Sequence, residues 1–256
     1  EAVYRDLYAR YRHELISDSR KRQHSKWMDK LQIIDSTTIS LFSNLIFKGV
    51  GRHPKTGKKK GGIKVHTVIH ANEGVPSDIK FTSAATNDSF ILKPSTLNKG
   101  DIMAMDRAYI DYEKFEELTQ RGVVYVTKLK KSLKYAINED IMYQTPNGLM
   151  EVRLQYVTFS KQVKGGETII HHARIVTYVD VKKRKLVSLL TNDLASDPDE
   201  IIAIYHRRWK IELLFKQIKQ NFPLRYFYGE SANAIKIQIW VTLIANLLLM
   251  VMQKRL

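Results

Sequence analysis

Short runs rich in β-branched and apolar residues alternate with helical segments along most of this chain, and this alternation predicts an α/β fold. Strands are expected at residues 31–42, 63–71, 78–83, 101–105 and 123–129. The break at residues 72–76 contains glycine and proline, which suits a hairpin between the second and third strands. Helices are expected at residues 90–97 and 112–120, and Gly122 is placed to end the second helix.

The pattern changes near residue 130, where short alternating segments are separated by turn signals such as Pro146-Asn147-Gly148. Strands are expected in this region at residues 151–159, 168–180 and 186–191. We therefore expect a β-rich insertion at residues 130–190, placed between the two parts of an α/β domain at residues 31–129 and 191–256. Residues 1–30 are expected to form a leading helix and a linker.

Two long helices are expected after the insertion. Asp197 is an acidic N-cap and Pro198 suits the first helical position, so one helix should run from there to about residue 221. The last helix is expected at residues 231–254. Its apolar stretch is interrupted by polar side chains and lacks the roughly 20 consecutive apolar residues of a membrane span. We therefore expect a buried core helix, with no role at a membrane.

The composition favours nucleic acid as a partner. Lys and Arg number 42 against 26 Asp and Glu, and the net charge of +16 attracts a polyanion. A generally basic, solvated surface would explain the same excess. The sequence has no cysteine, which excludes disulfides, zinc–thiolate sites and thiol chemistry. It begins with neither Met nor the apolar core of a signal peptide, as expected for a piece of a longer protein.

The expected helix after Pro198 carries four polar side chains on one stripe. With Tyr205 at zero and about 100° per residue, the others fall between about −60° and −20°: Arg208, Glu212 and Lys219. A row of surface ion pairs would explain this stripe, and the residues alone favour that explanation because such pairs are common. The alternative is a metal-binding carboxylate beside cations that hold the phosphates of the same substrate.

Two aspartates lie in or beside apolar strands. Asp35 interrupts the first strand, where a charge is costly unless it faces a cleft, a partner or a metal. A solvent-facing position on an edge strand would also accommodate Asp35. Asp106 follows the short strand at residues 101–105, and strand ends are both ordinary positions for Asp and the places where α/β folds bind ligands.

The spacing Tyr205-x2-Arg208-x3-Glu212-x6-Lys219 resembles the Y-R-E-K signature of bacterial DDE transposases of the insertion-sequence-four family. Asp35-Ser36-Thr37 is similar to the first aspartate motif of that family, and Asp106-Arg107 to the second. The resemblance extends from about residue 31 to the end of the chain. It favours the interpretation that the helical stripe binds a metal and phosphates over the interpretation that it is a row of surface ion pairs.

The resemblance implies an RNase H-like mixed sheet flanked by helices, with the β-rich insertion before the helix that carries the glutamate. It implies that Asp35, Asp106 and Glu212 are catalytic and hold two Mg²⁺ or Mn²⁺ ions, since hard cations prefer oxygen ligands. The expected activity is metal-dependent hydrolysis at transposon ends, followed by strand transfer into target DNA. Family members act as homodimers on double-stranded DNA in the bacterial cytoplasm, so association with the nucleoid is expected.

The resemblance also implies that Tyr205, Arg208 and Lys219 contact phosphates at the DNA end. A basic, glycine-bearing loop at residues 48–62 includes Lys58, Lys59 and Lys60, which we expect to contact the DNA backbone without reading sequence. A solvated loop would have the same composition. Two other functions fit the chain: a metal-dependent nuclease without strand transfer, and an inactive DNA-binding protein derived from a transposase.

Overall fold

The computed structural model describes residues 1–16, 27–41, 62–144, 151–162, 166–181, 183–222, 224 and 226–256. Contacts divide the chain into two compact units. The first unit comprises Glu1–Asp29, Ile34–Asp88 and Trp209–Leu256, and the second comprises Lys30–Ile33 and Ser89–Arg208. Strand β1 (Leu31–Ser40) therefore begins in the second unit and continues in the first.

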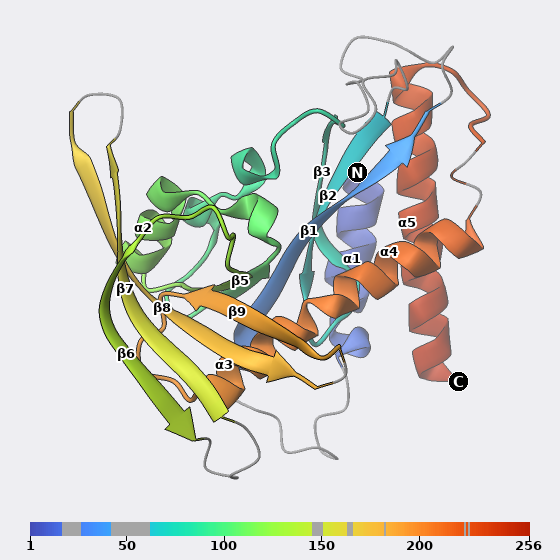
Figure 1. The fold of residues 1–256 in the computed structure, drawn as a ribbon. Helices are drawn as coiled ribbons and strands as arrows, with labels where there is room; N and C mark the ends of the chain where they lie inside the picture. The colour runs from blue at the N-terminus through green and yellow to red at the C-terminus, as the bar shows by residue number, and fades with distance from the viewer. Residues whose placement is uncertain are drawn as a thin grey trace. The chain divides into compact units, whose positions relative to one another are not determined.

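The sheet of the first unit contains β1, β2 (Gly62–His70) and β3 (Pro76–Ser83), in the order β3-β2-β1 (Figure 1). β2 and β3 are antiparallel, with Ile63 opposite Ser83. This pairing confirms the predicted hairpin. Gly74 lies in its connection with a φ of 75°, a backbone conformation that glycine adopts without steric cost.

The helices of the first unit are α1 (Ala2–Leu15), α4 (Trp209–Asn221) and α5 (Ala232–Arg255). α1 and α5 pack together through aromatic side chains, because the ring centroids of Tyr4 and Trp240 are 5.5 Å apart. Phe81 of β3 lies at the same distance from Trp240, edge to face. The Tyr4 hydroxyl donates to the Pro76 carbonyl at 2.8 Å, so the buried phenol has a partner.

The strands of the second unit follow the start of β1 in this order: β4 (Ile102–Met105), β5 (Val124–Lys128), β9 (Lys185–Thr191), β8 (Thr168–Asp180), β7 (Glu151–Gln162) and β6 (Ala136–Gln144). β4 and β5 are parallel, whereas the pairs from β5 to β6 are antiparallel. The sheet is therefore mixed. Helices α2 (Tyr112–Gln120) and α3 (Pro198–Arg207) pack against it.

The strands predicted within the insertion are present as β7, β8 and β9, whereas β6 was not predicted. The side chains of β6 are almost all exposed, so it lacks the apolar alternation that marks a half-buried strand. The proposed domain boundaries near residues 30, 130 and 190 stay predictions.

Two helix predictions are corrected. The single helix expected at residues 90–97 is replaced by two 3₁₀ turns, Asp88–Ile91 and Pro94–Thr96, because Pro94 has no N–H for a continuous helix. The helix expected from Pro198 to residue 221 is divided into α3 and α4 at Arg208. The Arg208 N–H donates to Tyr205 O at 3.1 Å, three residues back, which is the tighter 3₁₀ pattern.

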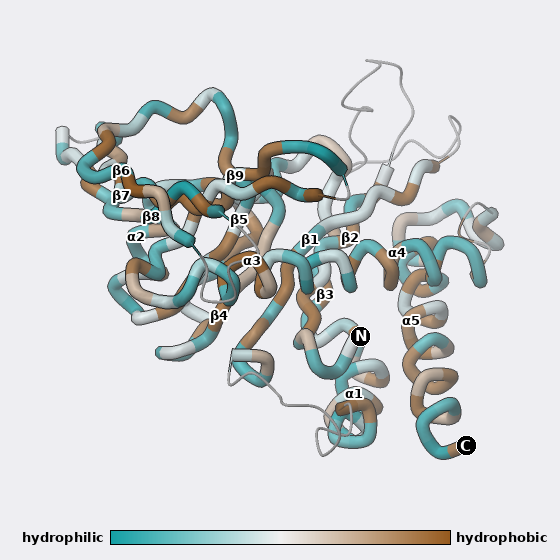
Figure 2. The backbone as a smooth tube through the Cα atoms, turned by 60° about the horizontal axis from the view of Figure 1, so that its bottom comes forward, coloured by the Kyte–Doolittle hydropathy of each residue, from teal (hydrophilic) through white to brown (hydrophobic). Residues whose placement is uncertain are grey.

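Helix α5 is long and apolar enough to meet the length and composition criteria for a membrane span, and Figure 2 shows apolar residues along much of it. One face, which includes Ile239 and Leu247, is buried. A second apolar face is exposed and includes Ile237, Val241 and Met252. The prediction of a buried core helix is therefore correct for only one side of α5.

We expect Phe115→Ala to lower the free energy of unfolding by about 3–5 kcal/mol, the usual cost of emptying an aromatic core site. Phe115 is fully buried on α2, and its ring stacks on Tyr125 of β5 with centroids 4.0 Å apart. Urea unfolding measures the change. Phe90→Ala is the matched control, because Phe90 is 71% exposed and should change stability by no more than about 0.5 kcal/mol. Equal effects of the two substitutions would contradict this packing.

Candidate functional site

Asp35 lies near the middle of β1 and is half-buried. Its Oδ1 atom accepts a hydrogen bond from the Ser36 backbone N–H at 2.8 Å. Leu31, Ile33 and Ile34 of the same strand are buried, so the strand is anchored in the core while Asp35 keeps access to solvent. A carboxylate held in this way has a defined position on the strand.

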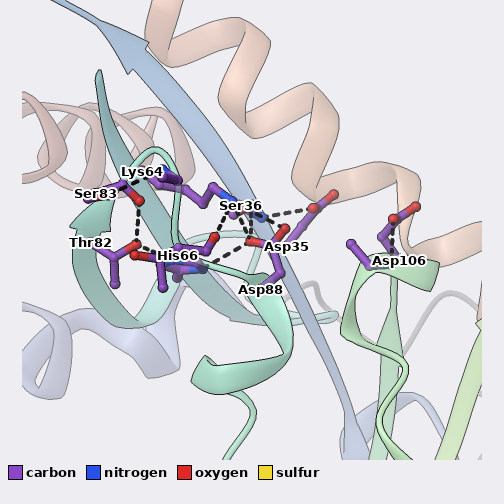
Figure 3. Close-up of polar contacts among 11 residues, drawn as sticks. Asp35, Ser36, Lys64, His66, Thr82, Ser83, Asp88 and Asp106 are labelled. Atoms are coloured by element: carbon purple, nitrogen blue, oxygen red, sulfur yellow. Dashed lines mark hydrogen bonds and ion pairs between the residues drawn. The ribbon is translucent and has the colours of Figure 1, made fainter. Parts of the chain in front are cut away.

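Ser36, the residue after Asp35, belongs to a cluster of polar side chains that Figure 3 shows. The Ser36 hydroxyl donates to Asp88 Oδ1 at 2.8 Å. Lys64 Nζ lies 3.3 Å and His66 Nδ1 lies 3.4 Å from the same oxygen, and both residues come from β2. His66 Nε2 shares a 2.7 Å hydrogen bond with the Thr82 hydroxyl of β3. The cluster thus joins all three strands of the first unit.

Glu212 lies in the first turn of α4 and is half-buried. A negative charge at this end of a helix is favoured by the helix dipole. The neighbouring Lys210 donates to the Ala71 carbonyl at 2.8 Å, which ties the start of α4 to the end of the β2 segment. The position of Glu212 is therefore set by a helix terminus that is itself anchored.

Lys219 lies two turns further along α4. Its ammonium donates to the Thr38 carbonyl of β1 at 3.2 Å, and desolvation lowers the pKa of Lys219 from its usual value of 10.5. This side chain also lines a small, mainly apolar pocket between the sheet and the helices, beside Phe215 and Ile239. In this structure Lys219 connects α4 to the strand that carries Asp35.

Asp106 directly follows β4 in the second unit. Its Oδ1 accepts from the Ala108 N–H at 2.9 Å and so caps the 3₁₀ turn Arg107–Tyr109. The cap fixes the side chain at the carboxyl end of the parallel strand, where α/β folds place ligand-binding groups. Capping is also an ordinary structural role for Asp at such a position.

Tyr205 of α3 and Arg208 form a close pair in the second unit. The guanidinium carbon of Arg208 lies 5.5 Å from the centre of the Tyr205 ring, within the range of a cation–π interaction. The helix is interrupted at Arg208, which keeps helical dihedral angles of φ −52° and ψ −31°, so the single stripe expected for Tyr205, Arg208, Glu212 and Lys219 stays a prediction. The first two residues belong to the second unit and the last two to the first unit.

The structure thus places Asp35, Glu212 and Lys219 in one unit and Asp106, Tyr205 and Arg208 in the other. Among the residues that the structure describes, no three His, Asp or Glu side chains are grouped as the ligands of a metal ion. The predicted DNA contacts of the basic loop lie outside the described residues: Lys58, Lys59 and Lys60.

Two polar anchors near the candidate residues were not identified from the sequence. Asp88 lies just before the helix expected at residues 90–97 and was not singled out, although it accepts from Ser36, which is 52 residues away. Lys210 was not singled out, although it anchors α4 to Ala71. Both contacts join distant parts of the sequence, so no local pattern in one sequence could reveal them.

The fold is that of the RNase H-like class. A solved structure of a piggyBac transposase in a synaptic complex with hairpin DNA matches with a TM-score of 0.51 and 10% sequence identity. The match covers 88% of this chain and 47% of that chain. At this identity the likeness concerns the fold alone, and it agrees with the predicted mixed sheet flanked by helices.

The profile of the family described as Transposase DDE domain matches residues 26–248, and the chain belongs to that family. A protein of Sinorhizobium fredii named as a transposase is 28% identical over 232 residues, which cover 91% of this chain and 63% of that protein. A protein of Geobacillus stearothermophilus, named as the transposase of insertion sequence element IS5377, is 21% identical over 89% of this chain and 58% of its own length. The chain thus spans about three fifths of these relatives.

We expect the stability of the protein to depend on the ionisation of His66. Burial lowers the pKa of His66 from 6.5 to about 4, although the Asp88 charge opposes this shift. The His66 imidazole binds a proton more readily in the unfolded chain than in the folded chain. Neutral His66 therefore supports the folded state fully above pH 6.5, and this support is lost as the pH falls toward 4.

Urea unfolding at a series of pH values between these limits tests this dependence. His66→Gln should give a free energy of unfolding that falls less steeply with decreasing pH than that of the wild type. His13→Gln, which changes an exposed histidine of α1, is the control. Parallel curves for the wild type and His66→Gln would show that His66 does not contribute in this way.

Proposed function

We propose that this chain is the catalytic core of a DNA transposase that cuts transposon ends and joins them to target DNA. The observation that carries the proposal is the family match over residues 26–248, which includes Asp35, Asp106 and Glu212. Each of these carboxylates belongs to a motif similar to one of the DDE transposases. Because the relatives are longer than this chain, the activity is proposed for the full-length protein.

The three carboxylates are proposed to act as the ligands of two divalent ions. Their donors are all oxygen, which suits Mg²⁺ or Mn²⁺. When bound, such ions lower the pKa of the attacking water or 3′-hydroxyl and stabilise the departing oxygen. Asp35 would contribute its carboxylate from β1, and Asp106 would contribute its carboxylate from the end of β4. Glu212 would contribute its carboxylate from the first turn of α4.

The proposed reaction has two in-line displacements at phosphorus. In the first, water attacks the phosphodiester at the transposon end, the bond to the 3′-oxygen breaks, and a free 3′-hydroxyl is released. In the second, that hydroxyl attacks a target phosphodiester and a target 3′-oxygen leaves. The number of phosphodiester bonds is unchanged in the second step, so joining requires no external energy source and no covalent bond to the protein.

Tyr205, Arg208 and Lys219 are proposed to contact phosphates of the DNA end. The ring of Tyr205 supports the Arg208 guanidinium, and a planar guanidinium suits bidentate contacts to phosphate. Lys219 would exchange its bond to the Thr38 carbonyl for a phosphate oxygen. Its partial desolvation favours this exchange, because a nearby anion stabilises the charged ammonium.

The remaining parts of the proposal concern partners. Double-stranded DNA, as both transposon end and target, matches the net charge of +16. Lys58, Lys59 and Lys60 are proposed to contact its backbone. The full-length protein is proposed to act as a homodimer that holds two ends, in the cytoplasm of a bacterium and on the nucleoid when bound to DNA.

The proposal is tested with the full-length protein, DNA carrying the ends of its own element, and Mn²⁺ or Mg²⁺. The wild type should cut the end, and it should join a pre-cut end with a 3′-hydroxyl to a plasmid. Glu212→Gln should abolish both reactions while binding to the end changes by less than about 3-fold, since it removes charge but little volume. Glu230→Gln changes an exposed carboxylate of the same unit and is the control.

Other results of these cutting and joining assays would indicate a different function. Cutting without joining of the pre-cut end would identify a nuclease. Binding without metal-dependent cutting by the wild type would identify an inactive DNA-binding protein. Normal cutting by Glu212→Gln would remove Glu212 from the catalytic set.

We expect Arg208→Ala to weaken end binding and to reduce its dependence on salt. Loss of one phosphate contact should decrease the slope of log K against log salt concentration by about 1. Fluorescence anisotropy between about 50 and 200 mM salt measures this slope. Arg207→Ala, which changes the preceding residue on α3, is the matched control and should preserve the slope. An unchanged slope in Arg208→Ala would exclude a phosphate contact.

A further inference from the structure

We propose that Asp88 is a positioning residue for the Asp35 carboxylate, and that it acts through Ser36. The inference rests on the proposed function, because it assigns a role in that reaction. It names a fourth acidic residue that affects catalysis from outside the DDE motif. Asp88 contacts neither DNA nor metal in this proposal.

The first step in the argument is the set of contacts that Asp88 makes. Its Oδ1 accepts from the Ser36 hydroxyl at 2.8 Å and lies 3.3 Å from Lys64 Nζ. Its Oδ2 lies 3.4 Å from the same ammonium. Lys64 also donates to the Thr86 carbonyl at 2.8 Å, two residues before Asp88. The lysine therefore fixes both the carboxylate and the segment that carries it.

The second step is the burial of this cluster. The side chains of Lys64 and Asp88 are 14% and 16% exposed, and that of His66 is 1% exposed. Charges with so little solvent around them interact more strongly and are less screened by salt than surface pairs. The Asp88 carboxylate is consequently held in one position, and Ser36 has a fixed acceptor.

The third step concerns β1. Successive side chains of a strand point to opposite faces, so Asp35 and Ser36 project from opposite sides of the strand. Ser36 links the two residues: its hydroxyl donates to Asp88 on its own face of the strand, and its backbone N–H donates to Asp35 Oδ1. Figure 3 shows Lys64, His66 and Asp88 gathered beside Ser36. Asp88 thereby restricts rotation of β1 about its own axis at Asp35.

The fourth step is the consequence for catalysis. A catalytic group must be held within about 0.5 Å and 10–20° of its productive geometry. A small rotation of β1 would move the Asp35 oxygens by that amount, because the carboxylate extends away from the strand axis. Supporting groups behind metal ligands typically change metal affinity or activity by about 10- to 100-fold when they are altered. We expect an effect of this size for Asp88.

The test compares Asp88→Asn with wild type in the full-length protein, by end cutting as a function of Mn²⁺ concentration. Asp88→Asn keeps an acceptor oxygen of the same size but loses the charge that pairs with Lys64. It should lower the cutting rate at saturating Mn²⁺ or raise the half-saturating Mn²⁺ concentration by about 10- to 100-fold. Binding of the DNA end should change by less than about 3-fold, because Asp88 does not contact it.

Glu73→Gln is the matched control, because it makes the same carboxylate-to-amide change in the same unit. The side chain of Glu73 is 1% exposed and accepts from Tyr8 and Arg12 of α1, so its loss affects stability without touching β1. Glu73→Gln should show a Mn²⁺ dependence equal to that of the wild type. This control separates a loss of stability from a change at the catalytic carboxylate.

A second pair of variants covers the case in which Asp88→Asn does not fold. Ser36→Ala removes the hydroxyl and leaves the Asp88–Lys64 pair in place, so it should reproduce the altered Mn²⁺ dependence. Ser36→Thr restores a hydroxyl and should recover most of the lost activity. A folded Asp88→Asn or Ser36→Ala with the Mn²⁺ dependence and rate of the wild type would overturn the inference.

Failure of the proposed function gives a different result. If the wild type does not cut, or if Asp35→Asn cuts as well as the wild type, then the assignment of Asp35 is wrong. If Asp35→Asn is inactive while Asp88→Asn and Ser36→Ala match the wild type, then only the positioning role of Asp88 is wrong.

Discussion

The partly buried ion pair between Asp88 and Lys64 is the polar contact on which the proposed positioning of Asp35 rests, because it fixes the acceptor of the Ser36 hydroxyl. Such a pair is screened less by salt than a fully exposed pair, because solvent reaches it only in part. The pair also accepts the hydrogen bond of Ser36 on β1 and lies beside His66 on β2. His66 in turn contacts Thr82 on β3, so the polar cluster includes residues of β1, β2 and β3. The candidate catalytic strand is thus supported by polar contacts as well as by its apolar core.

Regular elements were predicted from the sequence wherever their side chains are buried on one face. The helix at residues 112–120 and the hairpin of β2 and β3 were confirmed, because apolar periodicity, Gly122 and the turn residues all agree there. β6 was missed because exposure removes that periodicity. The division at Arg208 was missed because no glycine or proline marks it, and 3₁₀ bonding at that residue has no local signal.

The candidate residues were found through motif spacing, which does not reveal helix boundaries or contacts between distant residues. Tyr205 belongs to α3, Arg208 lies between the helices, and Glu212 and Lys219 belong to α4, so the spacing does not reveal the helix boundary within the motif. Contacts such as those of Ser36 with Asp88 and of Lys219 with Thr38 join residues that are 52 and 181 positions apart. A single sequence contains no periodic trace of such pairs, whereas it does contain the motifs themselves.

The exposed apolar side of α5 has a practical consequence for experiments on the 256-residue chain. A long helix that presents Ile237, Val241 and Met252 to water gains free energy when that side is shielded. Preparations of the 256-residue chain should therefore self-associate at high protein concentration and in sulfate buffers, which strengthen apolar association. Crystallisation and scattering experiments on the chain should include low-concentration reference samples and a mild detergent.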